Sequence, residues 1–340
     1  MARAFIGYQP TVEDYWTGLI LFGRNTTSFK FALGRALLDL KPSAGQLITL
    51  QELAEPFATH LCDHMQSADK QGTSPKGLFL DACAKANAGE LSHTELVEQT
   101  VRLGFQNVID AFHILGGQEI PRRFFVDERG RHGGIRVTDA FAELVSGHQY
   151  SSLPLEAEAR WKLVEAAWEL EMSVPLVAVR HDSADESLFV RNSTNQRRPI
   201  TGAREALSGY QKGQCFYCYD AISVVGSTKP DVDHFFPHVL KQTAFVGQLD
   251  GIWNLVLACQ RCNRGVGGKS ARVPTIKLLE RLSARNEFLI DSHHPLRETL
   301  IDQTARSENG RRTFLTACHA AARKHLIHEW EPDECSAPLF

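Results

Sequence analysis

The chain has a net charge of −3 and 340 residues. This length is long for one domain, because domains run ~100–200 residues. Hydrophobic residues make up 43% of it and charged residues 23%, ordinary values for a globular protein with sizeable cores. No run approaches the ~18–20 apolar residues of a membrane span, and the N-terminus lacks the basic and apolar regions of a signal peptide, so we expect a cytoplasmic protein without membrane contact.

The first half of the chain predicts mainly helices. Residues 27–40 carry apolar positions at helical spacing, residues 46–65 continue helical, and Ser92 and Glu95 form the S-x-x-E capping box of a further helix. Residues 122–145 then predict a strand, a Gly-rich turn, a strand and a helix. Two short helices followed by a β-hairpin are the outline of a winged helix-turn-helix, but an α-rich domain with one hairpin fits the same pattern.

Residues 181–199 are polar and irregular, which is typical of a connector near a domain boundary. We therefore divide the chain into residues 1–185 and 186–340. A helix over 200–214 follows the connector, and helical periodicity after residue 270 predicts three more helices, over 273–289, 295–307 and 311–330.

The eight cysteines fall into two groups. Isolated cysteines in a cytosolic protein are usually buried thiols, as we expect for Cys62, Cys83, Cys318 and Cys335. The other four form two CxxC pairs, Cys215 with Cys218 and Cys259 with Cys262. Two such turns supply the tetrahedral set of four thiolates that zinc favours, whereas a redox dithiol needs only one pair. We expect structural Zn²⁺ and an ordered segment between the pairs.

That segment contains DVDHFFPH, residues 231–238. Hydrolysis of a phosphodiester needs a base for the attacking water, and histidine suits this role near neutral pH. It also needs a hard cation held by oxygen ligands to screen charge at phosphorus. Adjacent residues of a strand point to opposite faces, so Asp233 and His234 can serve one site only if the strand bends or bulges.

The ordered strings CFYC, DVDHFFPH and WNLVLACQRCNRGVGGK, over about residues 213–270, resemble the zinc-knuckle branch of the HNH endonucleases, also called His-Me finger or ββα-metal nucleases. With the mostly helical N-terminal domain that the periodicity predicts, for which a winged helix is one possibility, we expect an α+β protein. A zinc-stapled ββα-metal nuclease domain, packed with extra helices, would follow. Residues 231–235 would form its first strand, 253–259 the second, and 262–269 the entry to the helix.

The resemblance also implies roles for single residues. His234 would be the general base, and Asn254 would orient the loop that carries it. Asp233 and Asn263 would bind the catalytic ion, Mg²⁺ or Mn²⁺, while the four paired cysteines hold zinc. Asp231 stays open, because the family usually has a variable residue at that position.

Lys and Arg outnumber Asp and Glu between Arg197 and Arg285, which indicates a face for an anionic partner such as nucleic acid. The family's CNxxK is lengthened here to CNRGVGGK, so Arg264 replaces Lys269 as the better phosphate contact. The candidate nucleic-acid contacts are His238, Arg261, Arg264, Lys269 and Arg272. Basic residues over 275–285 recur at helical spacing and would track a nucleic-acid backbone or form a solvated face.

The leading hypothesis is a metal-dependent HNH endonuclease that leaves 5′-phosphate and 3′-hydroxyl ends on DNA, in bacterial restriction or anti-phage defence. One alternative is a non-catalytic zinc-knuckle and winged-helix DNA-binding regulator, which has no use for Asp233, His234 and Asn263 together. The other is an RNA-cleaving toxin on the same fold. The sequence does not decide whether the chain binds a partner protein from a defence system or forms a homo-oligomer.

Overall fold

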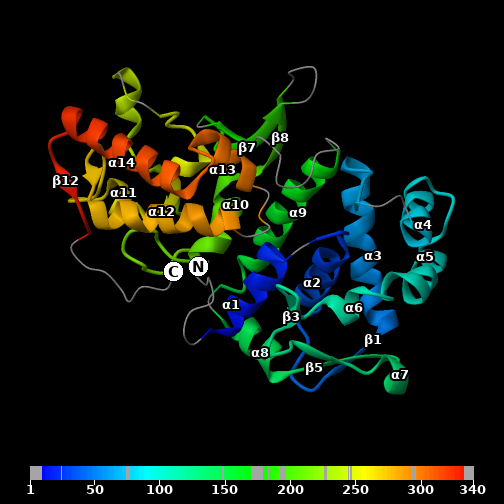
Figure 1. Cartoon of the computed structure of the whole chain (residues 1–340). Helices are drawn as coiled ribbons and strands as arrows, with labels where there is room; N and C mark the ends of the chain where they lie inside the picture. The colour runs from blue at the N-terminus through cyan, green and yellow to red at the C-terminus, as the bar shows by residue number, and fades with distance from the viewer. Residues whose placement is uncertain are drawn as a thin grey trace. The chain divides into compact units, whose positions relative to one another are not determined.

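The chain forms two compact units, one within Tyr8–Glu171 and one within Met172–Phe340, called the N-terminal and C-terminal units below. The computed structural model describes residues 10–23, 25–73, 77–147, 149–169, 179–182, 184–191, 197–225, 228–243, 245, 247–291, 294 and 296–332. Both units combine helices with small sheets, so the chain has the predicted α+β fold class (Figure 1).

The N-terminal unit is mainly helical, with α2, α3 and α9 packed side by side (Figure 1). Its α-helices are α1 Val12–Thr17, α2 Phe29–Leu40, α3 Leu50–Ser67, α4 Leu78–Asn87, α5 His93–Gln99, α6 Val108–Ala111, α7 Arg129–His132, α8 Asp139–Ser146 and α9 Leu153–Glu169. Two π-helical turns, η1 Gly18–Phe22 and η2 Thr100–Gly104, extend α1 and α5. The predicted capping box at Ser92 and Glu95 is confirmed and starts α5.

A three-stranded antiparallel sheet lies beside these helices, in the order β1-β5-β4. β4 Phe125–Asp127 and β5 Gly134–Val137 are the predicted hairpin, with α7 in the turn between them. β1 Leu47–Thr49 was predicted as helix and is a strand instead. The helix begins after it, at Leu50, because Thr49 is extended and its side chain accepts a hydrogen bond from the Glu52 backbone N–H at 3.2 Å.

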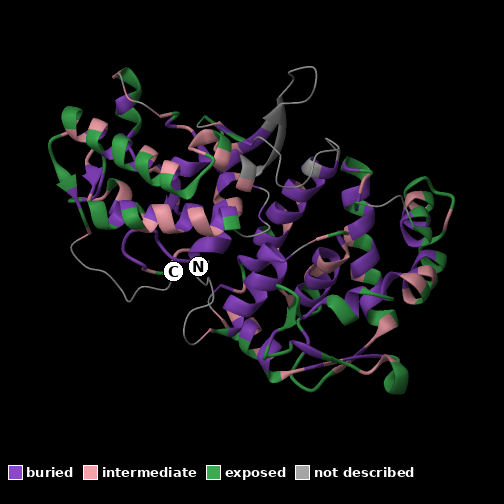
Figure 2. Ribbon diagram, in the orientation of Figure 1, coloured by how far each residue is buried: buried purple, intermediate pink, exposed green. Residues whose placement is uncertain are grey.

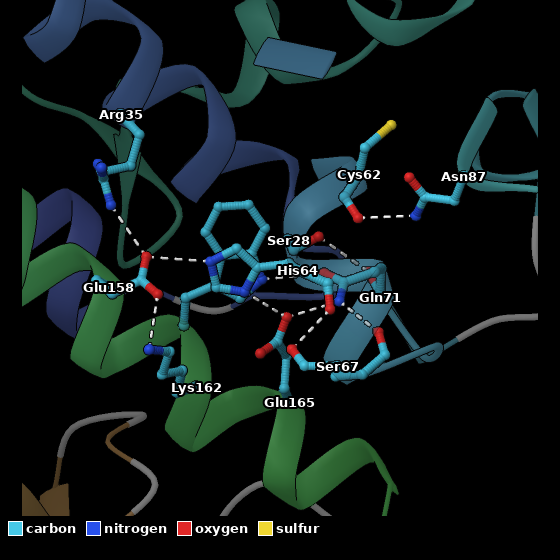
Figure 3. A network of polar contacts seen from close by, with 12 residues as sticks. Ser28, Arg35, Cys62, His64, Ser67, Gln71, Asn87, Glu158, Lys162 and Glu165 are labelled. Atoms are coloured by element: carbon cyan, nitrogen blue, oxygen red, sulfur yellow. Dashed lines mark hydrogen bonds and ion pairs between the residues drawn. The ribbon is translucent and has the colours of Figure 1, made fainter. Parts of the chain in front are cut away.

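Helix α9 is buried along most of its length and carries charged groups into the interior of the N-terminal unit (Figure 2). His64 of α3 lies between two of its carboxylates (Figure 3). His64 Nδ1 is 2.7 Å from Glu165 Oε1, and His64 Nε2 is 3.1 Å from Glu158 Oε2. The imidazole also stacks on the Trp161 indole, with ring centroids 3.6 Å apart.

Gln71, Trp161 and Arg35 extend this network. Gln71 donates to Glu165 Oε1 at 2.6 Å and accepts the Trp161 indole N–H at 3.0 Å, while Arg35 pairs with Glu158 at 3.0 Å. Burial by itself would lower the pKa of His64, but hydrogen bonds and charge from the two glutamates raise it to about 9. The network therefore joins α3 to α9 through a protonated imidazole.

The C-terminal unit begins with a three-stranded antiparallel sheet of order β6-β7-β8, formed by β6 Arg180–Asp182, β7 Ser187–Arg191 and β8 Arg197–Gly202. Residues 181–199 were predicted as a connector, and the described parts of them are mostly strand. The predicted boundary between residues 185 and 186 falls between β6 and β7 of this sheet. Residues 184–186 form a turn between β6 and β7 rather than a linker.

Helices frame the rest of the C-terminal unit. α10 Ala203–Gln211 follows the sheet, and the predicted C-terminal helices appear as α12 Ile276–Asp291, α13 Arg297–Gln303 and α14 Glu308–His325 (Figure 1). α12 packs against both α13 and α14. The short strands β11 Val273–Pro274 and β12 Glu329–Trp330 pair in parallel. Because β11 precedes α12 and β12 follows α14, this pairing brings the residues after α14 next to the start of α12. Among the described helices, none is both long and apolar enough to cross a bilayer.

The raised pKa of His64 predicts how the stability of the N-terminal unit depends on pH. The ordinary pKa is 6.5 and the folded value is about 9, so the stabilisation is complete below about pH 6.5 and is lost as the pH rises through about 9. We expect α3 and α9 to lose up to ~3 kcal/mol of protection across this window. Hydrogen exchange resolved by peptide mass spectrometry measures it.

His64→Gln should flatten this pH dependence, whereas His93→Gln, at an exposed position of α5, should leave it as in the parent. A slope that survives His64→Gln would assign the effect to other groups.

Candidate ββα-metal site

Two strands and a short helix bring most of the candidate site residues together. β9 Asp231–His234 pairs antiparallel with β10 Leu255–Ala258, residue by residue, with His234 opposite Leu255 and Asp233 opposite Val256. α11 Gln260–Arg264 follows β10 directly. Both strands lie where the sequence predicts them. The helix does not, since CNRGVGGK was expected to enter it and instead the glycines end it after Arg264.

The two CxxC pairs meet at one end of this hairpin. The Sγ atoms of Cys215, Cys218, Cys259 and Cys262 all lie within 4.8 Å of one another, and Cys218 and Cys259 are 3.8 Å apart. A tetrahedron with Zn–S bonds of ~2.3 Å has sulfur atoms roughly 3.8 Å apart. The backbone N–H of Cys259 donates to Cys215 Sγ at 3.3 Å, which suits a thiolate acceptor. The cluster could therefore hold a zinc ion.

Two of the four thiols of this cluster are set up to ionise, whereas hydrogen bonds within the cluster raise the pKa of Cys215 and Cys262. A hydrogen bond from Cys215 lowers the pKa of Cys218 to about 6, and hydrogen bonds from its neighbours lower the pKa of Cys259 as well. Thiolates, not thiols, bind metal, and a bound Zn²⁺ would deprotonate the remaining thiols, so the four sulfurs fit zinc as donors. Of the isolated cysteines, Cys62, Cys83 and Cys318 are buried thiols as predicted, and Cys335 lies outside the described residues.

Backbone carbonyls near the first CxxC pair are held by a basic residue of α12. Arg281 donates to Phe216 O at 2.6 Å and to Tyr217 O at 2.8 Å, and its guanidinium lies 4.1 Å from the centroid of the Tyr219 ring. Arg285 is buried and donates to Trp253 O at 3.2 Å. Both arginines therefore bind backbone carbonyls of their own unit, and the buried Arg285 cannot belong to the expected face that tracks nucleic acid.

His234 lies at the end of β9 in a cluster with His238 and Asp250. Its Nε2 is 3.1 Å from Asp250 Oδ1, and His238 Nε2 is 3.6 Å from the same oxygen. Asp250 also forms an ion pair with Lys241. Burial lowers the pKa of His234 to about 4 and outweighs the effect of Asp250, so the ring is neutral at physiological pH. With Nε2–H donating to Asp250, Nδ1 carries the lone pair that can accept a proton.

Sequence reasoning missed Asp250, because it lies in a loop and belongs to no recognisable motif. A carboxylate ahead of the Asn254-Leu255 pair was the only signal that could have found it.

Asn254 fixes the segment that follows His234. The side chain is fully buried; its Oδ1 accepts from Phe236 N at 2.8 Å, and its Nδ2 donates to Phe236 O at 3.2 Å and to Leu249 O at 2.8 Å. These bonds join the end of β9 to the loop that carries Asp250. Asn254 therefore acts on His234 through the backbone, which fits the orienting role implied for it.

Asp233 has partners different from those of His234. Its Oδ2 accepts from the Tyr217 hydroxyl at 2.6 Å, and its Oδ1 lies 3.2 Å from Lys269 Nζ. Burial raises its pKa, although Lys269 acts against this. The regular β9–β10 pairing places Asp233 and His234 on opposite faces. The bend expected for a shared site is not present in this ladder.

Lys269 was predicted as a phosphate contact and is not available for one. Its side chain is 1% exposed, and its ammonium also donates to His234 O at 3.0 Å. It is a buried counter-ion for Asp233, because the chain after Gly268 turns back under β9. Arg272 also turns inward and donates to the carbonyls of Gly267 and Gly268.

The structure brings Asn263 to Asp231 rather than to Asp233. Asn263 Nδ2 and Arg264 Nε both donate to Asp231 Oδ2, each at 3.0 Å. Arg264 and Arg261 are exposed, and Arg261 pairs with Asp220 at 2.7 Å. Asp231, left undecided by the sequence, and Asn263 offer adjacent carboxylate and amide groups, the oxygen ligands that Mg²⁺ and Mn²⁺ prefer.

Comparison of the chain with protein-family models, with curated proteins and with solved structures finds no match.

The four-cysteine cluster predicts about one tightly bound zinc per chain. Cys215→Ser should lose the metal and unfold the hairpin region, because ligation and folding are coupled in such sites. Cys318→Ser, which changes a buried thiol outside the cluster, should keep the metal. Metal analysis of the purified proteins measures both. Equal zinc content in the two variants would contradict the assignment.

The buried pair of Lys269 and Asp233 predicts a large effect on stability. Lys269→Met should lower the free energy of unfolding of the C-terminal unit by ~3–5 kcal/mol, because it leaves a buried carboxylate without its counter-ion. Arg264→Met breaks an exposed ion pair with Asp231 and should cost only ~0–1 kcal/mol. Urea unfolding of both variants tests this. Similar costs would show that Lys269 is not buried with Asp233.

Proposed function

We propose that the C-terminal unit is a metal-dependent HNH endonuclease that hydrolyses phosphodiester bonds, with DNA as its main substrate and 5′-phosphate and 3′-hydroxyl ends as products. The observation that carries this proposal is a neutral His234, held by Asp250 at the end of β9, in a hairpin closed by a four-cysteine cluster. A zinc-binding scaffold alone has no need of a histidine positioned in this way.

His234 would act as the general base. Its Nδ1 would take a proton from the attacking water while Asp250 stabilises the imidazolium that forms. Asp250 is therefore a positioning residue, and Asn254 is another, since it holds the loop between them. The low pKa of His234 in the free protein favours the neutral form that this role requires.

A divalent ion, Mg²⁺ or Mn²⁺, would supply charge screening at phosphorus and stabilise the leaving oxygen. We place its ligands on the side of β9 that faces α11, where Asp231 and Asn263 adjoin and Asp233 points to the same side two residues on. Asp233 can serve as a ligand only when Lys269 releases it. It would share a phosphate with His234 only if the end of β9 bends, since the two side chains lie on opposite faces of the strand. The four cysteines would hold zinc as a separate, structural ion.

The N-terminal unit would choose the target or restrain the nuclease. Its sheet order β1-β5-β4, with a hairpin after helices α3 to α6, supports a winged helix-turn-helix that docks on DNA. We place the enzyme in a bacterial restriction or anti-phage system with a partner protein. That placement depends on the family resemblance alone.

The first test incubates the full chain, with its zinc retained, with supercoiled plasmid or single-stranded RNA. Each substrate is tested with magnesium, with manganese, and after removal of both ions. We expect cutting of DNA that needs one of the two ions. His234→Ala should lower the rate ~10²–10⁴-fold, as loss of a general base does. His328→Ala, at an exposed position of the same unit, is the matched control.

Cutting by His234→Ala at the rate of the control would sink the catalytic assignment. Binding of plasmid without cutting would favour the DNA-binding regulator, and cutting of RNA alone would favour the toxin.

The choice of metal ligand is tested separately with Asp231→Asn and Asp233→Asn. If a carboxylate binds the catalytic ion, its substitution should raise the magnesium concentration needed for half-maximal cutting at least ~10-fold. A change in rate at saturating magnesium, without a change in the concentration needed, would place that carboxylate outside the metal site.

A further inference from the structure

A cavity of about 410 Å³ lies beside His234 in the C-terminal unit, between strands β6 and β7 and the loop that follows β9. Its lining includes His181, Phe189, Lys241, Phe245, Asp250 and Gln303. It adjoins the proposed catalytic base at two points. Asp250 lines the cavity and bonds to His234, and the His181 ring centroid is 6.1 Å from that of His234.

His181 is the most unusual group in this cavity. The residue is 7% exposed, and both of its ring nitrogens are buried without a hydrogen-bond partner among the described residues. Gln303, on α13, likewise has a buried Oε1 without a partner there. A buried polar group left unpaired costs ~1–3 kcal/mol, so groups of this kind gather where a ligand completes them.

The chemistry of these groups specifies what would complete them. Burial lowers the pKa of His181, so its ring is neutral and offers one donor and one acceptor. Gln303 Oε1 offers a second acceptor. Phe189 and Phe245 add aromatic surface. Exposed Arg180 adds positive charge, whereas Lys241 is paired with Asp250.

These hydrogen-bonding, aromatic and charged groups match a flat ring that has donors and acceptors on its edge and is attached to a phosphate. The cavity volume lies within the ~300–1,000 Å³ of ordinary ligand pockets. Aromatic side chains bind bases by stacking in proteins that hold single strands.

We propose that this cavity binds the base of a nucleotide that flanks the scissile phosphate. The proposal deepens the endonuclease function and depends on it for the identity of the strand. A base stacked inside a duplex cannot enter a cavity in this unit without leaving its stack. The substrate is therefore single-stranded DNA, or a duplex in which that nucleotide is unstacked.

The first experiment measures binding without catalysis. Deoxyadenosine monophosphate has no phosphodiester bond to cut, and its affinity for the full chain is measured by calorimetry or by chemical-shift changes. We expect His181→Ala to weaken binding about tenfold, equivalent to ~1.4 kcal/mol. Gln303→Ala, on a different element, should weaken it similarly, and the matched control His328→Ala should not. Gln303→Ala keeps the test valid if His181→Ala does not fold.

The second experiment asks where the base sits relative to the cut. A series of single-stranded oligonucleotides carries one abasic position, stepped along the strand, and cleavage is measured at a fixed bond. For the parent, one abasic position next to that bond should slow cleavage at least ~10-fold. For His181→Ala the same position should have little further effect, because the two changes remove one interaction. An intact duplex should be cut at least ~10-fold more slowly than the single strand.

The outcomes separate this inference from the proposed function. Binding of the nucleotide that depends on His181 and Gln303, in a protein that cuts nothing, would retain the cavity assignment and reject the nuclease. Magnesium-dependent cutting by a protein in which neither variant changes nucleotide affinity, and in which duplex and single strand are cut alike, would reject the cavity assignment and retain the nuclease.

Discussion

Convergence of four cysteine sulfurs is the constraint on which the C-terminal unit depends. Cys218 and Cys259 are 41 positions apart in sequence, and bringing them together forces the chain between them into a closed loop. The residues next to the cysteines then acquire fixed neighbours. Tyr217 reaches Asp233, Phe216 N donates to Leu257 O of β10, and Cys259 starts the helix that carries Asn263. A small hairpin without a large core of its own gains its rigidity this way.

The alternation of side chains along β9 divides the site into two electrostatic environments. On one face, Asp231 and Asp233 each have a cationic partner, one exposed and one buried. On the other face, burial removes charge from His234, and a single carboxylate orients it. The strand therefore presents carboxylates with cationic partners on one face and a neutral imidazole on the other.

Local signals in the sequence predicted the elements well and the contacts of single residues less well. Helical spacing found α2, α12 and α14, and the capping box found the start of α5. Residues 47–49 were predicted as helix but form a strand, because pairing with β5, far along the chain, decides their conformation. Lys269 and Arg285 were expected at the surface but are buried, because burial is a property of the fold, not of residue type. His181, Asp250 and Gln303 lie outside any motif, so only three-dimensional proximity reveals them.

The same strand geometry sets what kinds of sequence change the hairpin tolerates. Substitutions in β9 alter one side chain at a time, but loss or gain of one residue between Asp231 and His234 would exchange the faces of everything beyond it. The loop over Gly265–Gly268 carries no such parity, but its length sets where Lys269 meets Asp233. A family descended from this chain would therefore keep both the spacing within β9 and the spacing from Asn263 to Lys269, so spacing would identify distant members better than residue identity.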